Sequence, residues 1–144
     1  MKNDLQTTIE TYLQAWTARD VDAIVALHTP DTVFRLHVLG ETDAVGHDQV
    51  RAAFTKVFET WPDLAFNTLR LNVGADFFAH QMNVWGTPRN LTGHPDNATR
   101  EAPLPVHYEM LDVIIVRDGK IHRKDTFVDT LAILAGTSIV ENAA

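Results

Sequence analysis

Hydrophobic residues at the start of the chain recur every three to four positions, which is the period of an α-helix. Leu5, Ile9, Leu13 and Trp16 follow this spacing and predict an amphipathic helix over 3–18. The first part of the chain is therefore expected to be mainly helical. Two later runs with the same period predict further helices, over 21–27 and 46–61.

The pattern changes after Pro62, where runs rich in β-branched and aromatic residues predict strands. Segments 74–76 (Gly-Ala-Asp) and 117–119 (Arg-Asp-Gly) carry turn signals, the second typical of a tight hairpin. Segment 88–103 contains three prolines and is interpreted as a long hairpin tip. A short closing helix is expected over 130–136. The predicted strands cover 32–39, 64–73, 76–87, 104–116 and 120–128.

Helices that precede a series of strands predict a single α+β domain over 1–144, with the helices on one face of a largely antiparallel sheet. The strand at 104–116 is apolar on both of its faces, whereas a strand with one solvated face alternates. One face would carry Val106, Tyr108, Met110, Ile114 and Val116, and the other Leu111, Val113 and Ile115. We therefore expect helices on one face and a partner subunit on the other, which makes a homodimer through the sheet.

The composition excludes several classes of function. Lys and Arg number 12 against 19 Asp and Glu, a net charge of −7, so a cationic surface for nucleic acid is not expected. The absence of cysteine excludes disulfides, thiolate nucleophiles and cysteine-based metal centres. The seven histidines lack the spacing of metal ligands, so no metal is expected. No apolar run is long enough to span a bilayer and the first residues lack a signal-peptide pattern, so we expect no membrane contact and a cytoplasmic protein.

Several stretches resemble one superfamily. The run YLQAWTARDVDAIVAL at 12–27 is similar to the opening of ketosteroid isomerases and SnoaL-like polyketide cyclases. The likeness extends to WPDL at 61–64, WGT at 85–87, DGKI at 118–121 and FVD at 127–129. The order of the predicted elements also resembles the nuclear-transport-factor-2-like superfamily. The resemblance implies a cone-shaped α+β fold in which a curved antiparallel sheet and the first helices enclose a pocket.

The resemblance also implies a small carbonyl ligand and acid–base chemistry without a cofactor. Tyr12 falls where ketosteroid isomerases place the phenol that donates to the developing oxyanion. Asp129 resembles the acid/base of SnoaL-like cyclases, and His107 is the closest match to its histidine partner. Such a carboxylate removes a proton beside a carbonyl and returns it after ring closure. The implied activity is an aldol cyclisation or an isomerisation of a cyclic or polyketide-like compound.

Two other reactions of the superfamily are not expected. Leu36 stands where the ketosteroid isomerase has its general base, and the neighbouring His37 should face the other side of its strand. The Arg-x-Asp pair of limonene-epoxide hydrolases corresponds to Gln81 and Asn83, and their final aspartate corresponds to Thr126. Activation of water for epoxide opening requires a carboxylate base, which these positions lack.

The expected pocket combines aromatic walls with a few amides, which is typical of a site for a flat apolar ligand with one or two oxygens. Two amides on one inward face favour a wet or ligand-filled cavity over a dry core. Beside Tyr12, the substrate-binding residues are expected to be Trp16, Phe34, Gln81, Asn83 and Trp85.

Each catalytic candidate also has a structural interpretation. Asp129 precedes the closing helix and is typical of an N-cap. Tyr12 would pack its ring in the core, and His107 would be hydrogen-bonded between the sheet and a partner subunit. Two alternative functions follow: a protein that binds a small ligand or a partner without catalysis, and a dehydratase that uses the strand histidines His80 and His107.

Overall fold

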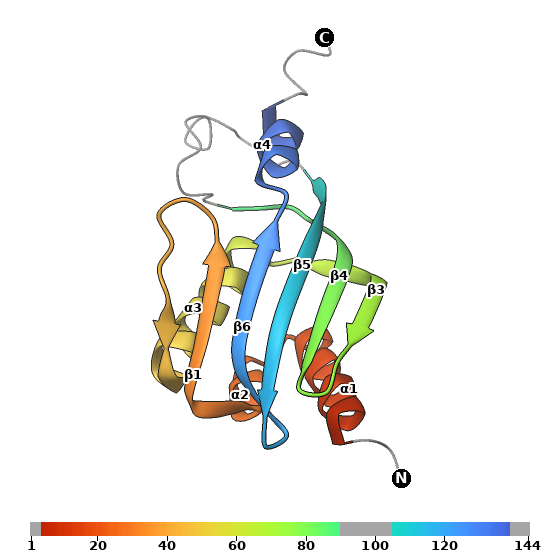
Figure 1. The fold of residues 1–144 in the computed structure, drawn as a ribbon. Coiled ribbons are helices and arrows are strands. Elements are labelled where there is room, and N and C mark those ends of the chain that lie inside the picture. The colour runs from red at the N-terminus through yellow and green to blue at the C-terminus, as the bar shows by residue number, and fades with distance from the viewer. Residues whose placement is uncertain (1–3, 90–104, 139–144) are drawn as a thin grey trace.

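The computed structural model describes residues 4–89 and 105–138 and shows helices packed on one face of a curved six-stranded sheet (Figure 1). Asp20 caps the second helix, because its side chain accepts a hydrogen bond from the backbone N–H of Ala23 at 3.0 Å. The helices are α1 (Asp4–Thr17), α2 (Val21–Ala26), α3 (Gly46–Thr60) and α4 (Thr130–Ser138).

The sheet has the strand order β2-β1-β6-β5-β4-β3, and the only parallel neighbours in that order are β1 and β6. The hairpin between β5 and β6 turns through Asp118 and Gly119, whose φ angles of 50° and 75° suit a two-residue loop. The strands are β1 (His28–His37), β2 (Ala44–Val45), β3 (Ala65–Val73), β4 (Phe77–Gly86), β5 (Val106–Arg117) and β6 (Lys120–Val128).

The expected α+β class with a curved sheet is confirmed, and three details differ from the prediction. The described strands form a largely antiparallel sheet, as expected, but β1 runs parallel to β6. β1 begins at His28, before the predicted start, and Pro30 falls in the irregular stretch between the paired positions 28 and 33. The short strand β2 was not predicted. The expected hairpin tip at 88–103 lies almost entirely outside the described residues.

The two faces of the sheet differ sharply in burial. On β5, Val106, Tyr108 and Ile114 point toward the helices and are buried. Leu111 and Ile115 point the other way and are 37% and 36% exposed. The division of this strand into two faces agrees with the prediction, and coverage of its outer face by a partner subunit stays a prediction. In the following text the face toward the helices is called the interior, and the opposite face is called the outer face.

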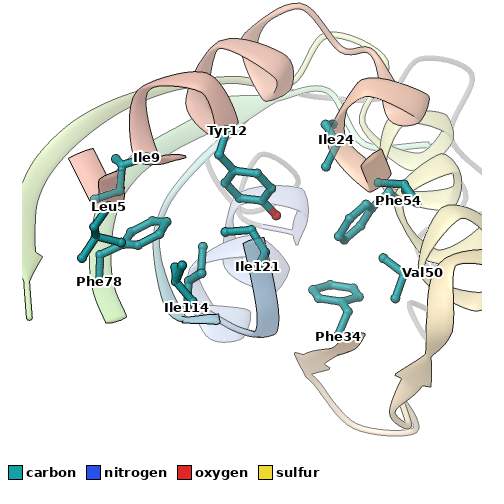
Figure 2. Packing of buried hydrophobic residues seen from close by; sticks show 12 residues of the cluster. Leu5, Ile9, Tyr12, Ile24, Phe34, Val50, Phe54, Phe78, Ile114 and Ile121 are labelled. Carbon is teal, nitrogen blue, oxygen red and sulfur yellow. The ribbon is translucent and has the colours of Figure 1, made fainter. Parts of the chain in front are cut away.

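The interior is built from side chains of α1, α2, α3 and the sheet. Figure 2 shows Tyr12 of α1 among apolar residues of the helices and strands, with Phe34 and Phe54 facing each other beside it. A second cluster lies near α4 and contains Trp61, Met82, Val84, Val106, Tyr108 and Ile133.

Candidate functional site

An ion pair lies in the interior, between two neighbouring strands. Asp112 of β5 and Lys124 of β6 are 5% and 4% exposed, and Lys124 Nζ donates to Asp112 Oδ2. Thr126 Oγ1 donates to the other carboxylate oxygen at 2.5 Å. The β5–β6 register pairs Asp112 with Thr126 and Ile114 with Lys124, which brings all three polar side chains to one face. Both oxygens of the Asp112 carboxylate are therefore engaged.

Burial of this pair is costly for the fold. Desolvation costs several kcal/mol per ion, and a buried pair is often no more stabilising than apolar side chains of similar volume. Burial lowers the pKa of Lys124, and the neighbouring Asp112 carboxylate opposes that shift. A buried ionisable pair with a shifted pKa is typical of functional sites, which makes this pair the first candidate for chemistry.

A second chain of buried polar groups starts at Tyr12. Tyr12 Oη lies 3.1 Å from His28 Nε2, and His28 Nδ1 lies 2.8 Å from Thr32 Oγ1. All three side chains are almost completely buried. Burial, followed by the charges of Lys124 and His47, lowers the pKa of His28 to about 3. His28 is therefore neutral near pH 7, with one ring nitrogen as donor and the other as acceptor.

Three hydrogen-bond donors gather near this chain. Burial raises the pKa of the Tyr12 hydroxyl well above its usual range. The interaction of this hydroxyl with the Trp16 N–H opposes part of that rise. Trp16 Nε1 is buried without forming a hydrogen bond to any described residue. Lys124 Nζ lies 5.8 Å from the centre of the Tyr12 ring and 5.2 Å from that of Trp16. The Trp16 N–H thus lies beside the Tyr12 hydroxyl without completing a hydrogen bond to it, and a ligand oxygen at this place would satisfy the donor.

Aromatic rings surround these donors on the side of α3. The Trp16 ring lies 4.9 Å from that of Phe54 and 5.3 Å from that of Phe58, measured between centroids. Phe34 packs against Phe54, also at 4.9 Å. The interior placement of Tyr12, Trp16 and Phe34 agrees with the sequence prediction, while their roles in binding stay predictions.

Asp129, the expected acid/base, lies elsewhere. Its Oδ1 accepts a hydrogen bond from the backbone N–H of Ala132 at 2.9 Å, which is the geometry of an N-cap for α4. Its side chain also borders an open hollow of about 350 Å³ on the outer face, which Gln81, Leu111 and Phe127 help to line. The structural interpretation of Asp129 therefore holds, and the sheet separates its carboxylate from Tyr12.

Four further candidates lie on the outer face. His107 Nε2 is 3.3 Å from Asn83 Oδ1, and the His107 ring meets the edge of Trp85. Gln81 Nε2 donates to Glu109 at 3.4 Å. The expectation that Gln81, Asn83 and Trp85 line the interior is wrong, because β4 directs its even-numbered residues inward.

The same alternation separates the two histidines of the dehydratase alternative. His80 is 1% exposed and points into the interior, where its Nε2 lies 2.7 Å from Thr68 Oγ1. Burial lowers its pKa. His107 faces the other way, so the structure does not bring the pair together. His37 also faces outward as expected, stacked on Phe127 at 4.0 Å.

The sequence interpretation missed Asp112, Lys124 and His28. Asp112 interrupts the inward apolar series of β5, between Met110 and Ile114. A charged residue at an inward position of an apolar strand is itself a signal, because an unpaired buried charge is not tolerated. Lys124 gives the matching signal on the next strand.

The described residues contain no group of three or more His, Cys, Asp or Glu side chains arranged to hold a metal ion. Among the same residues, no helix is both long and apolar enough to cross a membrane.

The α+β fold is that of ketosteroid-isomerase-like and nuclear-transport-factor-2-like proteins. A family model described as the SnoaL-like domain matches residues 9–124. The chain therefore belongs to the SnoaL-like domain family. No curated protein matches the sequence.

Solved structures show the same fold at low sequence identity. A candidate SnoaL-like polyketide cyclase from Jannaschia sp. CCS1 superposes with a TM-score of 0.78 and 19% identity, over 96% of each chain. A protein from Catenulispora acidiphila with a ketosteroid isomerase-like fold, in complex with trimethylamine, superposes with a TM-score of 0.72 and 15% identity. The match covers 90% of this chain and 91% of that protein. A phenazine biosynthesis-related protein from Pseudomonas aeruginosa superposes with a TM-score of 0.69 and 15% identity, over 92% of this chain and 90% of that protein. These likenesses establish the fold.

Proposed function

We propose that the protein binds a small, largely apolar carbonyl compound in the interior and performs acid–base chemistry on it without a cofactor. The observation that carries this proposal is the buried Asp112–Lys124 pair beside the donors of Tyr12 and Trp16. Membership of the SnoaL-like family is consistent with a ligand of cyclic or polyketide-like character.

Asp112 takes the part of acid and base in this proposal. Its carboxylate removes a proton from the carbon beside the carbonyl, which leaves an enolate. The enolate oxygen accepts hydrogen bonds from the Trp16 and Tyr12 donors, while the charge of Lys124 stabilises the anion in an environment of low dielectric. In an isomerisation the proton returns to another carbon, and in an aldol closure it goes to the new alkoxide. No electron is exchanged, so neither reaction needs a redox cofactor.

Tyr12 keeps the role that the sequence suggested for it. Its hydroxyl stays protonated because burial raises its pKa, which is the state needed for donation to an oxyanion. His28, neutral and anchored by Thr32, fixes the orientation of that hydroxyl. The acid/base role passes from Asp129 to Asp112 because only Asp112 lies on the same side of the sheet as Tyr12.

A binding protein without catalysis is the second candidate. It is favoured by the hydrogen bonds that Lys124 and Thr126 donate to the two Asp112 oxygens, since a carboxylate held in this way is less available to a proton of the ligand. Both candidates predict a ligand in the interior, but only the first predicts proton transfer.

Proton exchange on a model ketone distinguishes these two candidates. The probe is 2-tetralone, a flat apolar ketone, dissolved in D₂O with the protein and followed by proton NMR at the carbons beside the carbonyl. The wild-type protein is expected to accelerate exchange, and Asp112→Asn to reduce that acceleration by at least about 100-fold, a typical contribution of a general base.

Asp129→Asn is the matched control, because it makes the same chemical change on the other side of the sheet and should keep the exchange rate. Equal loss in both variants would contradict the assignment of Asp112. Binding of 2-tetralone without any exchange would favour the binding protein.

A further inference from the structure

Lys124 differs from the other lysines that the structure describes. Its side chain is 5% exposed, whereas that of Lys56 is 61% exposed, and Lys120 is also on the surface. Its amine ends between the Asp112 carboxylate and the rings of Tyr12 and Trp16. The nucleophilic atom of this lysine therefore lies at the place proposed for the ligand carbonyl.

The environment of Lys124 favours the free amine more than a surface would. Burial lowers its pKa, because the charged form loses its hydration. Asp112 is in direct contact and provides a place for the displaced proton. Transfer of that proton converts an ammonium–carboxylate pair into an amine–carboxylic acid pair, and the net charge of the interior does not change.

We propose that Lys124 forms a covalent imine with the carbonyl group of the ligand, and that Asp112 transfers the protons of this step. This inference rests on the proposed function, since it needs a carbonyl compound in the interior. It adds a nucleophile to a site whose chemistry otherwise consists of proton transfer.

The step balances in atoms and charge. The Lys124 amine attacks the carbonyl carbon, and the resulting carbinolamine loses its hydroxyl as water with a proton from the Asp112 carboxylic acid. The nitrogen ends as an iminium with one hydrogen, and Asp112 ends as a carboxylate. The two neutral groups and the ketone thus become an ion pair and one water. That ion pair occupies the place where Lys124 and Asp112 are paired in the free protein.

The unpartnered Trp16 N–H also fits this step. The carbinolamine carries a hydroxyl on the former carbonyl carbon, next to the Lys124 nitrogen. Trp16 Nε1 is a buried donor without a partner among the described residues, and its ring lies 5.2 Å from Lys124 Nζ. A hydrogen bond from this donor would hold the oxygen before it leaves.

Reductive trapping tests the inference on the intact protein. The protein is incubated with 2-tetralone and sodium cyanoborohydride, which reduces an iminium to a stable amine, and peptide mass spectrometry locates the adduct. We expect Lys124 to be labelled at least about tenfold faster than Lys56, an exposed lysine of the same protein that serves as the control. Labelling of Lys124 no faster than Lys56, under conditions where the ketone binds, would overturn the inference.

Lys124→Arg is the matched variant, because arginine keeps the positive charge beside Asp112 but forms no imine. We expect it to lose the fast adduct, and urea unfolding checks that it is folded. The measurement of trapping on the wild-type chain stands even if this variant does not fold. Deuterium exchange into 2-tetralone separates the two proposals. Exchange without trapping overturns only the imine, whereas absence of both exchange and binding overturns the proposed function and the imine together.

Discussion

Removal of one partner from the Asp112–Lys124 pair should be far more damaging than removal of both. Asp112→Leu leaves the Lys124 ammonium in an interior where its side chain is 5% exposed, with aromatic rings as neighbours. Loss of one member of a buried pair typically costs about 3–5 kcal/mol of unfolding free energy. Asp112→Leu combined with Lys124→Met removes both charges, and the double variant should recover most of this loss.

The loss of unfolding free energy in Asp112→Leu has an upper limit that can be calculated. An orphaned Lys124 escapes the cost of a buried charge by losing its proton. From an ordinary lysine pKa of 10.5, this costs about 5 kcal/mol at pH 7, at 1.36 kcal/mol per pKa unit. The folded variant then binds fewer protons than the unfolded chain, so its stability should rise by about 1.4 kcal/mol for each pH unit toward alkaline pH.

Urea unfolding of the wild-type protein, both single variants and the double variant, at several pH values between 6 and 9, measures the loss and its slope. A loss below about 1 kcal/mol in Asp112→Leu, without a pH slope, would refute the burial of this pair. If the loss of unfolding free energy in the double variant equals the sum of the losses in the two single variants, the coupling of the two side chains is refuted.

Three further outcomes follow from the structure. The folded pKa of His28 near 3, against 6.5 when unfolded, means that the unfolded chain binds more protons in this range. Stability should therefore fall by up to about 5 kcal/mol as the pH drops from 6.5 to 3, with a smaller slope in His28→Gln by urea unfolding. Asp129→Ala should cost about 1 kcal/mol as a lost N-cap and leave ketone binding unchanged in a calorimetric titration. Leu111→Lys on the outer face should convert the expected homodimer into a monomer by light scattering, whereas the fully exposed Leu39→Lys should not; a monomeric wild-type protein would contradict the dimer.

Local signals in the sequence were sufficient for most of the fold. The period of α1 and the Asp118-Gly119 turn act over a few residues, so each can be read without knowledge of its neighbours. The parallel pairing of β1 with β6 joins residues about ninety positions apart, such as Val33 and Arg123. No local pattern encodes such a pairing, so the sequence predicts a largely antiparallel sheet without indicating which strands run parallel.

The site was harder to predict because it depends on which way each strand faces. Gln81 and Asn83 were assigned to the interior through the alignment with epoxide hydrolases. The apolar residues Phe78, Met82 and Val84 gave the opposite assignment by simple alternation, and the structure agrees with them. The apolar residues are the better guide to which face of β4 points inward, because burial of large side chains dominates the free energy of a half-buried strand.

Asp112 illustrates the other difficulty. On β5 alone it is an isolated charge among apolar residues, and its meaning depends on Lys124, which approaches only when β6 pairs with β5 in the observed register. Asp129 was the opposite case, since its N-cap role depends on the three residues that follow it and was visible in the sequence.

A crystal structure of the complex with 2-tetralone would show whether the interior binds a carbonyl compound beside Asp112 and Lys124. We expect the ketone in the interior between Trp16 and Lys124, with its oxygen within hydrogen-bond distance of Trp16 Nε1. In that position the carbon beside the carbonyl lies within reach of Asp112. A ketone bound instead in the outer hollow beside Phe127 and Asp129, with the interior unchanged, would refute the assignment of the site to the interior.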